Sequence, residues 1–112
     1  MFDTFGFIKR ENGIDLREYD KLIRSVRYEE QKIRNWISRI DKKRSELISK
    51  MESYKKRKQT LLANIYAKEA GNLSAIREVL DLISLKLLAI AERLSTLKIV
   101  LMATSTLKPL LR

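Results

Sequence analysis

The chain has 112 residues, a formal net charge of +10, 34% charged residues, and only three glycines and one proline. So few turn-forming residues in so charged a chain argue against a sheet, whose strands need frequent turns, and favour long helices. The sequence has no cysteine and no histidine, which excludes disulfides, thiol or imidazole catalysis and the usual zinc sites. Its positive charge predicts a partner rich in phosphate or anionic lipid.

Residues 1–14 are predicted to be an irregular head that combines aromatic and basic side chains and ends in the Asn12-Gly13 turn signal. No signal-peptide pattern is visible, so we expect a cytoplasmic protein. Two roles fit the head: insertion at the surface of an anionic membrane, or packing back onto the rest of the chain. The candidate membrane-binding residues of this segment are Phe2, Phe5, Phe7, Ile8, Lys9 and Arg10.

Residues 15–56 are predicted to be the first helix. Asp15 and Glu18 have the spacing of a capping box, and Ile14 and Tyr19 flank it as a hydrophobic staple. Apolar residues then recur every seven positions, which is typical of a coiled-coil seam. The predicted seam is Tyr19, Val26, Ile33, Ile40, Leu47 and Tyr54, with Leu22, Ile23, Trp36, Ile37 and Met51 between them.

Charged residues interrupt this seam at Glu29/Glu30 and at Lys43/Arg44. We interpret the two glutamates as partners of basic residues rather than metal ligands, because no third ligand converges on them. If the chain folds back on itself, they are expected near Lys86. Trp36 is interpreted as a filler of the seam rather than a binding residue. We predict no metal, no cofactor and no catalytic residues.

Residues 60–108 are predicted to be the second helix, with Thr60 as its N-cap and Pro109 preventing its continuation, so that residues 109–112 form a tail. Gly71 is predicted to be tolerated inside this helix. Its apolar residues follow a strict alternation of three and four positions. The predicted seam is Leu73, Ile76, Leu80, Ile83, Leu87, Ile90, Leu94, Leu97 and Leu101.

The two seams are out of phase across residues 54–60, YKKRKQT. Leu73 lies 19 residues after Tyr54, two heptads plus five, whereas a continuous stripe would keep its register or shift by three or four. We therefore predict an all-α, long antiparallel two-helix hairpin over residues 15–108, with 54–60 as its tip. A single unbroken helix, continuing the first seam through Leu61 and Ile65, is the alternative.

Two further surfaces are predicted on the hairpin. The second helix has more apolar surface than one partner helix covers, which is typical of an interface. The predicted self-assembly surface is Val79, Leu82, Leu85, Leu88, Ile99, Val100 and Met102. The first helix and the tip carry cations that suit anionic lipid, although a solvated helix face and a solvated turn are the alternatives. These predicted membrane-binding residues are Arg17, Lys21, Arg24, Arg27, Lys55, Lys56, Arg57 and Lys58.

The stretch from Ile65 to Leu97 resembles the second core helix of ESCRT-III proteins, in particular the archaeal Cdv cell-division paralogues. The resemblance is carried by Tyr66-Ala67 and by the segments AIRE (residues 75–78) and AERLSTL (residues 91–97). The stretch YEEQKIRNWISRIDKKRSEL resembles the basic first helix of that family. Together they cover about residues 15–108.

The resemblance implies a hairpin that polymerises with itself and with paralogous ESCRT-III-like proteins on anionic membrane. It implies a peripheral location on the inner face of the cell membrane at the division site, and a role in constriction or scission. The regulatory helices of the family and its C-terminal ATPase-binding motif are not seen in this sequence, which makes ATPase recruitment by the chain doubtful.

Two other classes of function remain open. A basic coiled coil could bind nucleic acid through counterion release, although few aromatic residues are available for stacking and no specific nucleic acid is expected. An adaptor hairpin could cap a larger helical assembly. An enzyme is not expected, because the sequence contains no Gly-rich phosphate loop, nucleophile motif or convergent set of titratable residues.

Overall fold

The computed structural model describes residues 16–111, which form two long helices and a short terminal one. The first, α2, is Leu16–Lys56; the second, α3, is Thr60–Leu107; the 3-10 helix η1 is Lys108–Leu111. The helix α3 ends one residue before the predicted end, and Pro109 lies in η1. Gly71 is helical, as predicted. The predicted head and the capping residue Asp15 lie outside the described residues.

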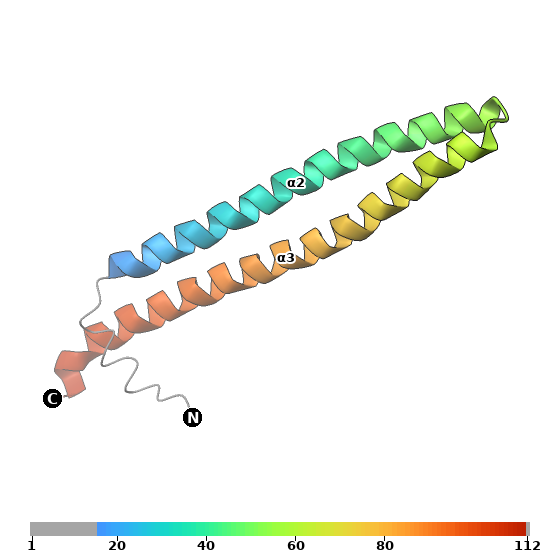
Figure 1. The fold of residues 1–112 in the computed structure, drawn as a ribbon. Coiled ribbons are helices and arrows are strands. Elements are labelled where there is room, and N and C mark those ends of the chain that lie inside the picture. Colours follow the sequence, from blue (N-terminus) through green and yellow to red (C-terminus); the bar gives the residue numbers. More distant parts are fainter. Residues whose placement is uncertain (1–15, 112) are drawn as a thin grey trace. The chain divides into compact units, whose positions relative to one another are not determined.

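The predicted hairpin is confirmed: α2 and α3 pack against each other and are joined by the turn Arg57–Gln59 (Figure 1). Lys58 has a φ of 62°, in the left-handed region. Its N–H donates to the Lys55 carbonyl at 3.0 Å, and the N–H of Gln59 donates to the Tyr54 carbonyl at 2.9 Å. These two bonds are the Schellman ending of a helix, which satisfies the last carbonyls of α2.

The start of α3 differs by one residue from the prediction. The carbonyl of Gln59 accepts the first helical bond, from the N–H of Ala63 at 3.0 Å, so Gln59 occupies the cap position and Thr60 is already helical. The reason is the compact ending of α2: its last bond is made by the N–H of Gln59, and the next helix begins immediately afterwards.

The hairpin divides into two compact units. We call Glu30–Lys86, which contains the turn, the turn-side unit. The remaining described residues, 16–29 with 87–111, form the terminal unit. Each helix contributes one segment to each unit.

The core of the turn-side unit is narrow. Its buried apolar residues are Ile37 and Leu47 of α2 with Ala63 and Ala70 of α3. Near the turn, the rings of Tyr54 and Tyr66 stack with centroids 5.5 Å apart and planes 4° from parallel. This aromatic pair closes the seam beside the tip, so the predicted place of Tyr54 in the seam is confirmed.

The prediction that Trp36 fills the seam is wrong. Its side chain is 53% exposed, whereas its neighbour Ile37 is 8% exposed. Most of the buried and half-buried residues of α2 in this unit recur at two heptad positions, and Trp36 belongs to neither. They are Ile33, Ile40, Leu47 and Tyr54 at one position, and Glu30, Ile37, Arg44 and Met51 at the other. Ile37 points into the contact with α3 and Trp36 does not, so the larger tryptophan side chain is the one left exposed.

The predicted seam of α3 is half wrong. The leucines of the stripe, Leu73 and Leu80 in the turn-side unit, are half-buried, but Ile76 and Ile83 are 49% and 39% exposed. The second inner row is instead a heptad repeat of small or polar residues: Ala63, Ala70, Arg77 and Ser84. Small side chains let the two backbones approach, whereas a row of isoleucines at that position would hold them apart.

The terminal unit follows the same plan. Tyr19 of α2 and Ala91 and Leu101 of α3 are buried, while Leu22 and Ile90, both expected in the seam, are 50% and 47% exposed. Among residues 16–111, no helix is long and apolar enough to cross a membrane.

Candidate functional surfaces

Glu30, one of the two glutamates that interrupt the seam of α2, is buried in the turn-side unit. Glu30 is only 6% exposed, and its carboxylate accepts hydrogen bonds from Arg34 and from Ser84 of α3, the latter at 3.5 Å. The side-chain partners of Glu30 are therefore Arg34 and Ser84. Ser84 is two positions before Lys86, so Glu30 lies within about one turn of its predicted neighbour. Ser84 is one of the small inner residues of α3, and its hydroxyl supplies the donor that a buried carboxylate needs.

A second polar contact joins the helices nearer the turn. Arg77 of α3 donates to the carboxylate of Asp41 at 2.6 Å, and Arg44 of α2 donates to the Ser74 hydroxyl at 3.4 Å. The hydrogen bond and the charge of Asp41, with the charge of Asp81, raise the pKa of Arg77. Because Arg77 stays charged at any physiological pH, this contact is independent of pH in that range. Such directional contacts fix the register of the two helices.

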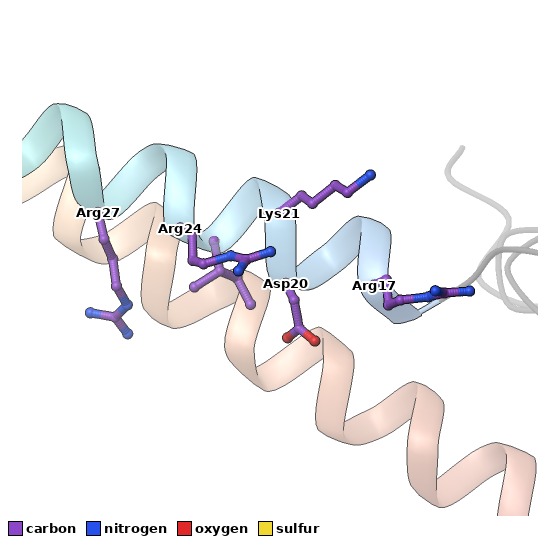
Figure 2. Close-up of a pocket in the computed structure, with 6 residues that line it drawn as sticks. Arg17, Asp20, Lys21, Arg24 and Arg27 are labelled. Carbon is purple, nitrogen blue, oxygen red and sulfur yellow. The ribbon is translucent and has the colours of Figure 1, made fainter.

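The predicted membrane-binding residues of α2 come together in the terminal unit. Arg17, Lys21 and Arg24 are four and three positions apart, so they lie on one side of the helix, and Arg27 lies one turn on. These cations, with Asp20 and Ile23, line an open depression on α2 (Figure 2). We call these four basic residues the basic cluster.

Two of the charges around this depression are paired with α3. Arg27 forms an ion pair with Glu92 at 3.1 Å, and Lys98 donates to Asp20, whose carboxylate points toward α3 in Figure 2. Among the described residues, Lys21 and Arg24 have no ion-pair partner. Exposed cations that lack a carboxylate partner are available to an external anion.

The basic tip is the second group of predicted membrane-binding residues. Lys55, Lys56, Arg57 and Lys58 are all exposed, and the guanidinium of Arg57 lies 5.6 Å from the ring centroid of Tyr54. Lys55 and Lys56 also end α2, where cations are favoured by the helix dipole. Lys58 lies beyond the end of α2, and its left-handed backbone conformation favours glycine over lysine. The tip therefore carries a fourth charge at a conformational cost.

The predicted self-assembly residues are all exposed, with 40% to 65% of each side chain accessible. In the turn-side unit these are Val79, Leu82 and Leu85. In the terminal unit they are Leu88, Ile99, Val100 and Met102. They do not form one narrow stripe: Val79 and Leu85, six positions apart, are about 120° apart around α3.

Sequence reasoning missed three exposed residues of the turn-side unit: Trp36, Ile76 and Ile83. The signal that marks them is the row of small residues in α3. Ala63, Ala70, Ser84 and Ala91 all fit one heptad position, and that regularity indicates close contact with a partner helix. Hydrophobicity alone places Ile76 and Ile83 in the seam, because it ranks isoleucine above alanine and serine.

These features define the class of molecule: a helical hairpin with a polar-laced seam, a basic cluster, a basic tip and an apolar outer surface on α3. No protein-family model, curated protein or solved structure matches the chain. The resemblance to ESCRT-III proteins therefore stays a prediction.

Proposed function

We propose that this protein is an ESCRT-III-like membrane-remodelling protein, which polymerises on anionic membrane and promotes constriction or scission during cell division. In this proposal it acts as a peripheral protein on the inner face of the cell membrane. Its partners are further copies of itself, paralogous ESCRT-III-like proteins and anionic lipids.

The observation that carries the proposal is the apolar outer surface of α3. All seven predicted assembly residues are at least 40% exposed, and Ile76, Ile83 and Ile90 add to them. A helix that is apolar on more than one side is stable in water only if more than one partner covers it. The only helix packed on α3 is α2 among the described residues. Further copies of the hairpin are the simplest additional cover.

The membrane part of the proposal is supported by charge. The basic cluster and the basic tip contain eight predicted lipid-binding cations, all exposed, and each cation near an anionic membrane surface contributes about 1 kcal/mol.

The exposed tryptophan weakens one argument against nucleic acid, since Trp36 is an accessible aromatic ring with Arg39 stacked 5.0 Å from its centroid. A nucleic-acid-binding coiled coil is therefore the second candidate.

A co-sedimentation experiment distinguishes the two. The protein is mixed with phosphatidylcholine vesicles, with and without phosphatidylserine, and double-stranded DNA is added as a competitor at the same salt. We expect pelleting only with phosphatidylserine, and electron microscopy of that pellet should show filaments on deformed vesicles. If DNA binds and the vesicles do not pellet the protein, the proposal is wrong.

A matched pair of variants tests the role of the basic cluster. Lys21→Glu with Arg24→Glu should weaken vesicle pelleting at least tenfold, on the order expected for reversing two surface cations. The control is Lys42→Glu with Lys68→Glu, which makes the same charge change at exposed residues of the turn-side unit. Equal loss in both variants would indicate a dependence on net charge alone. Monodisperse particles in every condition would favour the adaptor hairpin.

A further inference from the structure

One side of the turn-side unit combines an exposed tryptophan, cations and an apolar row. The Nζ of Lys50 lies 5.7 Å from the ring centroid of Tyr66, which fixes which edges of the two helices are neighbours. Trp36 is two heptads before Lys50, and Leu80 is two heptads after Tyr66. Because the helices are antiparallel, these steps match, and Trp36 lies on the edge beside Leu80.

On α3, the residues next to Leu80 on that side are the exposed Ile76 and Ile83, four positions before and three after it. Val79 lies beside them and is 58% exposed. On α2, Arg39 stacks on Trp36, and Lys43, seven positions after Trp36, has the same direction and is exposed. We call this surface the Trp36 face: Trp36, Arg39 and Lys43 of α2 with Ile76, Val79 and Ile83 of α3.

The opposite side of the same unit carries acidic residues. Glu78 and Leu85 are each two positions after an isoleucine of the Trp36 face, which places them about 200° round α3. Asp81 is on the same side, one turn from each, and both acidic side chains are exposed. Asp41 of α2, the acceptor of the Arg77 hydrogen bond, marks this edge of the seam. We call this surface the Glu78 face: Asp41, Glu78, Asp81 and Leu85.

We propose that the Trp36 face of one copy of this chain packs against the Glu78 face of the next copy. This rests on the self-assembly part of the proposed function and specifies the surfaces that meet. Arg39 and Lys43 oppose Glu78 and Asp81, while Trp36 and the isoleucine row pack against Leu85. Each contact uses the Trp36 face of one copy and the Glu78 face of the other, so each copy keeps one unused face for a further contact. The contact is therefore heterologous and can extend into an open filament.

The charges identify the occupant as a second copy. The Trp36 face is positive and the Glu78 face is negative, and both present exposed apolar side chains. Two Trp36 faces would repel each other, as would two Glu78 faces. An anionic membrane would suit the Trp36 face but would be repelled by the Glu78 face. Only pairing of unlike faces covers the apolar surface of both.

Fluorescence of Trp36 reports this contact directly, because the sequence contains one tryptophan. Packing of Trp36 against a second copy should shift its emission to shorter wavelength as protein concentration rises without lipid. Glu78→Lys with Asp81→Lys leaves the Trp36 face intact but reverses its partner. This variant should need at least about tenfold more protein for the same shift, because it places like charges in contact.

The complementary variant is Arg39→Glu with Lys43→Glu, which should also fail to assemble on its own. Mixing the two variants creates unlike faces at every contact, so the mixture should regain assembly near the wild-type concentration, measured by sedimentation. The control, Lys55→Glu with Lys56→Glu, makes the same charge change at exposed residues that belong to neither face and should assemble like wild type. Circular dichroism of each variant establishes that the hairpin is folded.

Three outcomes would overturn the inference. In the first, both reversed variants assemble as well as wild type. In the second, the folded variants fail alone and also fail when mixed. In the third, the emission shift appears only with phosphatidylserine vesicles and is unchanged by Glu78→Lys with Asp81→Lys, which places Trp36 on lipid. Vesicle pelleting is measured separately. Assembly without pelleting would contradict the membrane function but support this contact. Pelleting of a protein that stays monomeric would support membrane binding but contradict this contact.

Discussion

The two helices of the hairpin share one seam but differ in what they present outside it. Outside the seam, α2 is mostly charged, whereas α3 carries large apolar residues on both sides, Ile83 on one and Leu85 on the other. An amphipathic helix needs one partner, and an apolar helix needs several. The comparison indicates that α2 leaves only scattered large side chains exposed, Leu22, Tyr28 and Trp36, whereas α3 leaves apolar residues exposed along most of its length.

The seam itself shows the same division. The turn-side unit buries Ile37 and Leu47 from α2, but from α3 it buries Ala63, Ala70 and Ser84. The larger residues of α3 that alternate with them, Ile76 and Ile83, lie outside. The hairpin therefore uses the small residues of α3 for its internal contact and leaves larger ones available for external contact.

The largest expected effect separates a buried isoleucine from an exposed one. Ile37→Ala should lower the free energy of unfolding by about 3 kcal/mol, because it removes a buried side chain and leaves a cavity. Ile83→Ala, the matched change on the outside of α3, should cost less than about 1 kcal/mol in dilute protein. Chemical denaturation measures both. Equal losses of unfolding free energy in the two variants would indicate that Ile83 is buried in the seam.

A smaller effect tests the close approach of the helices in the terminal unit. Ala91 is 1% exposed, so Ala91→Leu should destabilise the hairpin by about 2 kcal/mol through overpacking. Ala89→Leu makes the same change at an exposed position of α3 and should stay within about 0.5 kcal/mol of wild type. Thermal unfolding of the two variants gives the comparison, and tolerance of leucine at Ala91 would contradict a tight seam.

The tip offers a change in the stabilising direction. Lys58→Gly should raise the free energy of unfolding by about 1 kcal/mol, because glycine adopts the left-handed conformation without a Cβ clash. Pelleting with phosphatidylserine vesicles should weaken at the same time, since one tip cation is lost. Lys56→Gly is the control: it removes the same charge from a helical residue and should destabilise the hairpin. A stability gain in Lys56→Gly, or none in Lys58→Gly, would be inconsistent with the turn described here.

Gly71 gives an effect of about the same or smaller size. A Cβ built at this helical residue meets nothing within 4 Å, so Gly71→Ala should raise stability by up to about 1 kcal/mol through helix propensity alone. Denaturation in dilute protein measures this gain. A loss of stability would show that the position is crowded.

The sequence predicted the helices well because their signals are local. The heptad repeat of α2, the break in phase after Tyr54 and the stop before Pro109 together gave the end of α2 and both ends of α3 within one residue. The turn, residues 57–59, is shorter than the predicted tip, 54–60, because the helices continue to Lys56 and from Thr60. The basic cluster also followed from sequence, since Arg17, Lys21 and Arg24 share one side of any regular helix. The surface around Trp36 did not, because it depends on which edges of two helices are neighbours.

What the sequence by itself determined is therefore the period of each helix and the place where the chain reverses. What only the tertiary structure decided is the rotation of α3 about its own axis. An isoleucine row and an alanine–serine row both lie beside the leucine row with the same seven-residue repeat. The choice between them was made by α2, whose bulky seam and buried Glu30 require small side chains and a hydroxyl donor opposite.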